Sequence, residues 1–314
     1  MPARGSKRRQ SLLEEQPTRR RSNDNQTPQQ PDGINVIEGD DDDNIIEGSS
    51  ANDLIVGSYG NDLISGGAGT DVVSYSDLDD PITLVRAGAV VKADGSTDVF
   101  PDFSVEAFVG AKGEANVIDA STGITAAVAI DLGEGSLAVN GIPGLDPVSF
   151  QVENFVDAIG TQNSDSITGS RTNNVLQGEA GDDSIAGGRG KDILSGGEGS
   201  DTFVFEQGDS RAKRFDVITD LAIGTDIIDG WSEVSVVQNL GSIDALVKSE
   251  VCELLDSSAL AQDAAAVFQV TGQAGEEART FLAINDGSAG FSWRNDSLIE
   301  ITGFSGDLQD LSII

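Results

Sequence analysis

Residues 178–204 read GEAGDDSIA, GGRGKDILS and GGEGSDTFV when the sequence is written in units of nine. Each unit has Gly at its first and fourth positions, Asp at its sixth and an apolar residue at its eighth. Glycine permits tight turns with positive φ, so the first half of a unit predicts a loop that brings main-chain carbonyls together. The last three residues predict a short strand whose eighth-position side chain faces a core.

Two such units make one turn of a coil, so residues two units apart lie above one another. Asp165, Asp183 and Asp201 then form a column with a spacing of about 4.8 Å. Stacked carboxylates repel each other strongly unless a cation lies between them. Loops that offer only carboxylate and carbonyl oxygens favour a hard ion with flexible geometry, which means Ca²⁺ before Mg²⁺. The sequence therefore predicts several bound calcium ions.

These nine-residue units, called nines below, occupy two blocks, residues 34–74 and 160–204, and each block keeps one register throughout. Their sixth positions are Asn35, Asn44, Asp53, Asp62, Asp71, Asp165, Asn174, Asp183, Asp192 and Asp201. Their eighth positions are Ile37, Ile46, Ile55, Ile64, Val73, Ile167, Leu176, Ile185, Leu194 and Phe203. A flexible, acidic, glycine-rich linker is the alternative interpretation, and the strict apolar register argues against it.

The sixth-position side chains are the expected calcium ligands. The carboxylates should be the stronger ones, whereas the amides of Asn44 and Asn174 bring no charge and should bind weakly. Loop glycines are expected to add carbonyl oxygens, namely Gly48, Gly57, Gly60, Gly66, Gly69, Gly178, Gly181, Gly187, Gly190, Gly196 and Gly199.

The nonapeptide resembles the calcium-binding repeat of the RTX (repeats-in-toxin, hemolysin-type) family. The resemblance implies a mainly β fold, a right-handed parallel β-helix or β-roll. It also implies export by type I secretion machinery, which uses an uncleaved C-terminal signal, and therefore an extracellular or cell-surface protein without an N-terminal signal peptide.

The amino-acid composition excludes several classes of catalytic and binding site. The chain has 314 residues, with 19 Lys and Arg against 53 Asp and Glu, no His and one Cys. Without His it has no Ser-His-Asp or Cys-His nucleophile and no His-ligated zinc site, and Cys252 alone cannot form an intramolecular disulfide. Because the chain is strongly acidic, its electrostatic field repels phosphate, and nucleic acid is not an expected partner. No apolar stretch is long enough to span a membrane.

Residues 1–33 are basic and rich in Gln and Pro, and they contain no apolar segment typical of a secretory signal. We interpret them as a disordered arm, with an arm that binds nucleic acid or an anionic surface as the alternative.

Residues 75–159 interrupt the nines with two β-rich units about 47 residues apart. In these units 105–109 (VEAFV) matches 152–156 (VENFV), and Asn116 matches Asn163. Wider coils on the same solenoid are the simplest interpretation, and a separate small β-sandwich is the alternative. No catalytic signature occurs here, so we expect no enzyme; a carboxylate-based hydrolase with its site in this insert is the alternative.

Residues 205–314 predict a small α+β cap over the end of the solenoid. A helix is expected over 242–256, and strands over 266–270, 280–284 and 298–301. Four acidic residues are further candidate ligands, namely Asp209, Asp216, Asp220 and Asp226. The ending DSLIEITGFSGDLQDLSII resembles the tail of cyanobacterial RTX-type surface proteins with a bluetail domain. That resemblance implies a structural or adhesive role, with a surface polysaccharide or another surface protein as partner.

Overall fold

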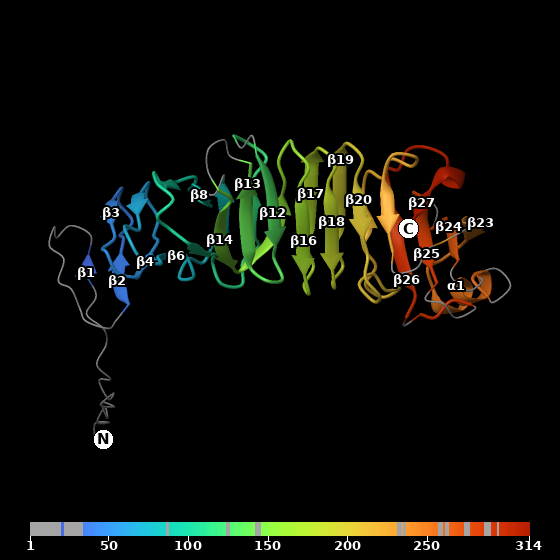
Figure 1. The fold of residues 1–314 in the computed structure, drawn as a ribbon. Helices are drawn as coiled ribbons and strands as arrows, with labels where there is room; N and C mark the ends of the chain where they lie inside the picture. Colours follow the sequence, from blue (N-terminus) through green and yellow to red (C-terminus); the bar gives the residue numbers. More distant parts are fainter. Residues whose placement is uncertain are drawn as a thin grey trace, which may run out of the picture.

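The computed structural model describes residues 20–21, 34–85, 88–123, 126–141, 146–230, 234, 237–256, 260, 264–272, 277–285, 290–293 and 295–314. The expected disordered arm, residues 1–33, lies outside the described residues except for strand β1 (Arg20–Arg21). Figure 1 shows an elongated stack of strands that run across the long axis, with the first block of nines at one end and the C-terminal segment at the other.

The described strands form two long sheets. The first sheet has 13 strands in the order β1, β2 (Asn35–Glu38), β4 (Asp53–Val56), β6 (Val72–Ser74), β10 (Ala107–Val109), β14 (Val148–Glu153), β13 (Ser136–Asn140), β12 (Ala127–Asp131), β16 (Ser166–Ser170), β18 (Ser184–Gly188), β20 (Thr202–Val204), β22 (Ile227–Asp229) and β27 (Ser312–Ile313). The second has 14 strands in the order β23 (Val237–Ile243), β24 (Ala265–Val270), β25 (Arg279–Ile284), β26 (Ser297–Ile301), β21 (Val217–Ile218), β19 (Ile193–Glu198), β17 (Val175–Ala180), β15 (Phe155–Ile159), β11 (Asn116–Asp119), β7 (Ile82–Val85), β8 (Ala89–Lys92), β9 (Thr97–Val99), β5 (Leu63–Ser65) and β3 (Ile45–Glu47).

Strands of successive nines alternate between the two sheets, and each pairs in parallel with the strand two units further on. Ile55 is in register with Val73, and Ile185 with Phe203. The eighth-position side chains are at most 1% exposed, except Ile37, which is partly buried. These side chains form the core between the sheets, because alternate residues of a strand face the same side. The mainly β, parallel coil predicted from the sequence is confirmed, while its right-handed sense stays a prediction.

The strands of the insert belong to the same two sheets, and the described residues form no third sheet. Each sheet takes in one antiparallel triplet, which is β7–β8–β9 in the second sheet and β12–β13–β14 in the first. The middle strand of each triplet therefore runs against its neighbours, a reversal that the parallel repeat did not predict. β12 pairs in parallel with β16, the first strand of the second block of nines, so the parallel stacking continues from the insert into that block.

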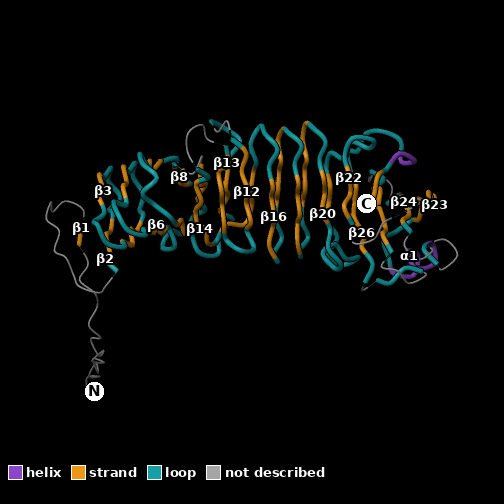
Figure 2. The backbone as a smooth tube through the Cα atoms, in the orientation of Figure 1, coloured by secondary structure: helices purple, strands orange, loops and turns teal. Residues whose placement is uncertain are grey.

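The C-terminal strands follow the expected boundaries within one residue. β26 pairs in parallel with β21, so the antiparallel group β24–β26 continues the second sheet (Figure 2). The predicted helix over 242–256 was too long, since α1 spans Lys248–Leu254. Ser242 and Ile243 belong instead to strand β23, which pairs with β24. A second apolar cluster forms here, with the rings of Phe268 and Phe281 stacked at 5.7 Å. A short 3-10 helix, η1 (Leu308–Asp310), precedes the final strand.

Candidate calcium-binding loops

The sixth-position side chains form two buried columns along the coil. Within the blocks, the backbone N–H of a sixth-position residue donates to a carboxylate Oδ1 one turn further on: Asp53 to Asp71 at 2.8 Å, and Asp183 to Asp201 at 3.0 Å. The same bond joins Asn44 to Asp62, Asp165 to Asp183 and Asn174 to Asp192. At the start of the first column, Asn35 reaches Asp53 Oδ1 with its side-chain amide instead, at 2.7 Å. The repeat thus holds each carboxylate in a fixed orientation without using its second oxygen.

Both columns continue beyond the nines. Asp192 N donates to Asp216 Oδ1 at 2.8 Å, and Asp201 N donates to Asp226 Oδ1 at 3.1 Å. At the start of the insert, Asp62 N donates to Asp98 Oδ1 at 3.1 Å. Asp71 N likewise donates to Glu106 Oε2 at 2.6 Å.

Asp98 and Glu106 were missed by the sequence analysis, although a short signal marks them. Each acidic residue stands two positions before a buried apolar one, as in Asp98-Val-Phe100 and Glu106-Ala-Phe108. Asp216 and Asp226 stand in the same relation to Ile218 and Ile228. This three-residue remnant of the nine survives where the loop ahead of it has changed length.

The other two C-terminal candidates lie off the columns. Asp220 accepts hydrogen bonds from Ser195 Oγ and from the amides of Gly196 and Gly197. Asp209 accepts from the amide of Glu206, and burial raises its pKa.

The loops fall into two classes according to the second oxygen of the sixth-position side chain. In closed loops, the amide at position two donates to that side chain. Ser49 N donates to Asp53 Oδ2 at 2.5 Å, and Ser170 N to Asn174 Oδ1 at 2.7 Å. Thr161 pairs in this way with Asp165, and Asp40 with Asn44. These side chains are therefore satisfied within the protein.

In open loops, Oδ2 of the sixth-position carboxylate is buried and has no hydrogen-bond partner among the described residues. The open-loop carboxylates are Asp71, Asp183, Asp192 and Asp201; Oδ2 of Asp62 is likewise buried without a hydrogen-bond partner among the described residues, but it lies 3.8 Å from Lys92 Nζ. Position two in the open loops has a positive φ, of 95° at Gly67, 79° at Glu179, 76° at Gly188 and 101° at Gly197. Such a φ is unusual for a residue with a side chain, so Glu179 shows that the turned conformation is imposed by the fold.

Burial perturbs these carboxylates. It raises the pKa of Asp183 to about 7 and that of Asp192 to about 7, since an ionised group loses its hydration there. The pKa values of Asp71 and Asp201 are raised for the same reason. Asp216, whose Oδ2 also lacks a hydrogen-bond partner among the described residues, has its pKa raised by burial to about 8.

First-position glycines lie against these carboxylates and against carbonyls of the neighbouring turn. A Cβ atom built on Gly178 would lie 2.2 Å from Asp183 Oδ2 and 2.6 Å from the carbonyl oxygen of Gly196. One built on Gly196 would lie 2.2 Å from Asp201 Oδ2. Only glycine fits such a position, and it leaves carboxylate and carbonyl oxygens facing the same small space.

These donors fit a hard cation. An orphaned, buried carboxylate oxygen is costly unless a positive charge compensates for it. In the part of the chain that the structure describes, no group of three or more acidic or cysteine side chains could hold a metal ion by itself. Main-chain carbonyls must therefore complete each site, which suits Ca²⁺ with its many oxygen ligands.

Comparison with protein families identifies the repeat. The family model of the RTX calcium-binding nonapeptide repeat (4 copies) matches residues 32–58, 38–73, 47–80, 159–194, 168–203 and 181–211. No curated protein matches the chain. None of the helices in the described ranges is long and apolar enough to cross a membrane. The matched ranges cover the two blocks of nines, so these blocks are RTX calcium-binding nonapeptide repeats.

Proposed function

We propose that the chain is a secreted, non-catalytic protein whose coil folds when calcium binds to the open loops outside the cell. The observation that carries the proposal is the set of buried carboxylate oxygens without a hydrogen-bond partner in those loops. A cation that binds the folded chain and not the unfolded one stabilises the fold. At a tenfold excess over its dissociation constant, one such site contributes about 1.4 kcal/mol, and several sites in series act together.

The open loops are the proposed principal sites. Asp71, Asp183, Asp192 and Asp201 would bind through Oδ2, with Asp216 as a further ligand at the end of its column. Asp53 and Asp165 would bind weakly, because the position-two amide already occupies their second oxygen. Asn44 and Asn174 would contribute least, since their amides are uncharged.

Export gives this coupling a purpose. In a compartment poor in calcium the carboxylate columns repel themselves and the chain stays open, which is the state that a secretion channel requires. In millimolar calcium outside the cell, the same chain becomes a rigid rod. Residues 205–314 would act both as the type I secretion signal and as the cap of the coil, and the rod would serve the cell surface or matrix as a structural or adhesive element.

Among the described residues, a pocket on the insert bears on the hydrolase alternative. Its lining includes the carboxylates Glu134 and Glu153, and both side chains are exposed. Glycoside hydrolysis needs two carboxyl groups in unlike environments, one kept protonated and one ionised. Two exposed carboxylates do not provide that difference, which favours a role without catalysis.

Ion counting tests the proposal. Equilibrium dialysis of the full chain against calcium, followed by elemental analysis, should give several ions per chain near millimolar calcium and few when Mg²⁺ replaces it. A chain that holds no calcium under these conditions would refute the proposed function. Fractionation of producing cells should recover the chain outside them, and retention in the cytosol would refute export.

A further inference from the structure

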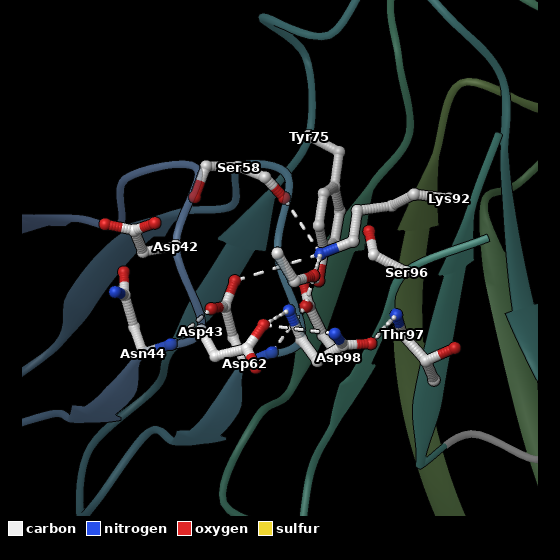
Figure 3. A network of polar contacts seen from close by, with 12 residues as sticks. Asp42, Asp43, Asn44, Ser58, Asp62, Tyr75, Lys92, Ser96, Thr97 and Asp98 are labelled. Carbon is white, nitrogen blue, oxygen red and sulfur yellow. Dashed lines mark hydrogen bonds and ion pairs between the residues drawn. The ribbon is translucent and has the colours of Figure 1, made fainter. Parts of the chain in front are cut away.

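A buried lysine lies inside one of the loops of the first block. The side chain of Lys92 is 0% exposed, as are those of Asp62 and Asp98 beside it (Figure 3). Its Nζ donates to the carbonyl oxygens of Ser58 at 2.9 Å and Gly60 at 2.7 Å, and to Asp98 Oδ1. These bonds use all three ammonium protons. Asp62 Oδ2 lies 3.8 Å from the same nitrogen.

The partners of Lys92 are repeat positions rather than an arbitrary set. Ser58, Gly60 and Asp62 are the second, fourth and sixth residues of the nine at 57–65. Asp98 is the next member of the same column, because it accepts the backbone N–H of Asp62. Two loop carbonyls and two successive column carboxylates therefore converge on one positive charge.

The antiparallel triplet β7–β8–β9 places Lys92 at the loop of residues 57–65. Strand β8 runs against its neighbours and turns Val90 and Lys92 inward. Val90 enters the core, and Lys92, at the end of the strand, reaches the loop. The remaining oxygen of Asp98 accepts a hydrogen bond from the buried Tyr75 hydroxyl at 2.6 Å. The ammonium and both oxygens of Asp98 are thus satisfied within the protein, as a buried ion pair requires. Asp62 Oδ2 has no hydrogen-bond partner among the described residues and faces the same positive charge.

We propose that the Lys92 ammonium is a built-in cation that takes the place of calcium in the loop at 57–65. The loop would then need no calcium ion of its own when the coil folds, because Asp62 and the carbonyl of Gly60 would face the ammonium instead of an ion. Removal of the lysine would leave two carbonyls and two buried carboxylates, a donor set suited to Ca²⁺. This inference rests on the proposed function, because the other loops must bind calcium for the substitution to have meaning.

The matched variants are Lys92→Ala and Lys112→Ala in the full chain, since Lys112 is an exposed lysine of the same insert. Calcium ions per folded chain are counted by native mass spectrometry across a calcium titration. Lys92→Ala should bind one ion more than the wild type and should need a higher calcium concentration to fold its first block, whereas Lys112→Ala should match the wild type. An unchanged, non-zero count for Lys92→Ala would overturn the assignment of Lys92, while a count of zero in every chain would refute the proposed function instead.

The wild-type chain provides a test that does not depend on how the variant folds. Crystals grown with Tb³⁺ as a calcium substitute should show anomalous peaks in the open loops and none between Ser58, Gly60 and Asp98. A lanthanide peak at that position, with Lys92 displaced, would contradict the proposal.

Discussion

At the scale of single residues, position two of the nine decides what the position-six carboxylate can bind. At Ser49 and Thr161 the position-two amide satisfies the carboxylate. At Ser58 it does not, and Asp62 Oδ2 faces Lys92 Nζ at 3.8 Å instead. Where a residue with positive φ stands there, as at Gly188 and Gly197, one carboxylate oxygen remains buried and unpaired. The consensus sequence thus marks the binding loops by a backbone conformation as much as by the aspartate itself.

Asp192→Ala should weaken calcium binding, because it removes a charged ligand from an open loop. We expect the calcium concentration at half-folding to rise about tenfold, which corresponds to roughly 1.4 kcal/mol. Asp77→Ala removes an exposed carboxylate outside the columns and should leave the midpoint unchanged. Both midpoints are measured by far-UV circular dichroism, and equal effects of the two variants would show that the assigned register is wrong.

Gly196→Ala should destabilise the calcium-loaded coil by roughly 2 kcal/mol or more, because the added Cβ would lie 2.2 Å from Asp201 Oδ2. The matched control is Gly133→Ala, where the nearest atom to the new Cβ would be 3.3 Å away. Neither glycine has a positive φ, so the comparison isolates the close approach. Urea unfolding in excess calcium measures both changes. Equal stability of the two variants would show that the close approach of residue 196 to the Asp201 carboxylate does not require glycine.

At the scale of elements, the three residues from the sixth to the eighth position recur throughout the coil with the same arrangement, a polar side chain in a column and a buried apolar side chain two residues later. The sequence predicted this unit wherever a complete nine surrounds it, and so predicted the parallel register and the core residues. It did not predict Asp98 or Glu106, because their loops depart from nine residues and only the short acidic-x-apolar remnant is left. Asn116 shows the same limit. The sequence matched it to Asn163, but in the structure its position corresponds to that of Asp165. The Asn116 side chain accepts the backbone N–H of Ile82, and Asp165 accepts that of Val128, each from the first strand of an antiparallel triplet.

Because the columns contain buried carboxylates, we expect the free energy of unfolding of the calcium-free coil to fall as the pH rises. Burial raises the pKa of Asp183 and of Asp192 to about 7, whereas an unfolded Asp titrates near about 3.9. The folded chain therefore holds protons that the unfolded chain has released, and its free energy of unfolding falls as the pH rises from about 4 to about 7. Calcium competes with those protons, so its stabilising effect should grow over the same range.

Far-UV circular dichroism of the full chain in calcium-depleted buffer at pH 5, 6, 7 and 8 measures this dependence, because the β signal reports the fraction of the chain that is folded without the ion. The calcium-free chain should be most stable at pH 5, and Asp183→Asn should reduce the slope because it removes one of the titrating groups. A calcium-free chain that becomes more stable as the pH rises would contradict the burial of ionisable carboxylates in the columns.

At the scale of the whole molecule, the insert and the C-terminal segment extend one solenoid. The periodicity of the sequence predicted the wider coils, but not the antiparallel triplets, since the reversal of a strand depends on turns that carry no repeat. The same reversal brings Lys92 into a loop, which no count of nines could reveal. The resemblance of the tail to bluetail surface proteins stays a prediction.

The central claim is that calcium binding and folding of the coil are one event. The most direct test is a calcium titration of the full chain followed by far-UV circular dichroism, with Mg²⁺ as the control ion. We expect a cooperative gain of β signal near millimolar calcium and no comparable gain with Mg²⁺. The same β signal in chelator as in millimolar calcium would contradict it, because the coil would then be stable without the ion.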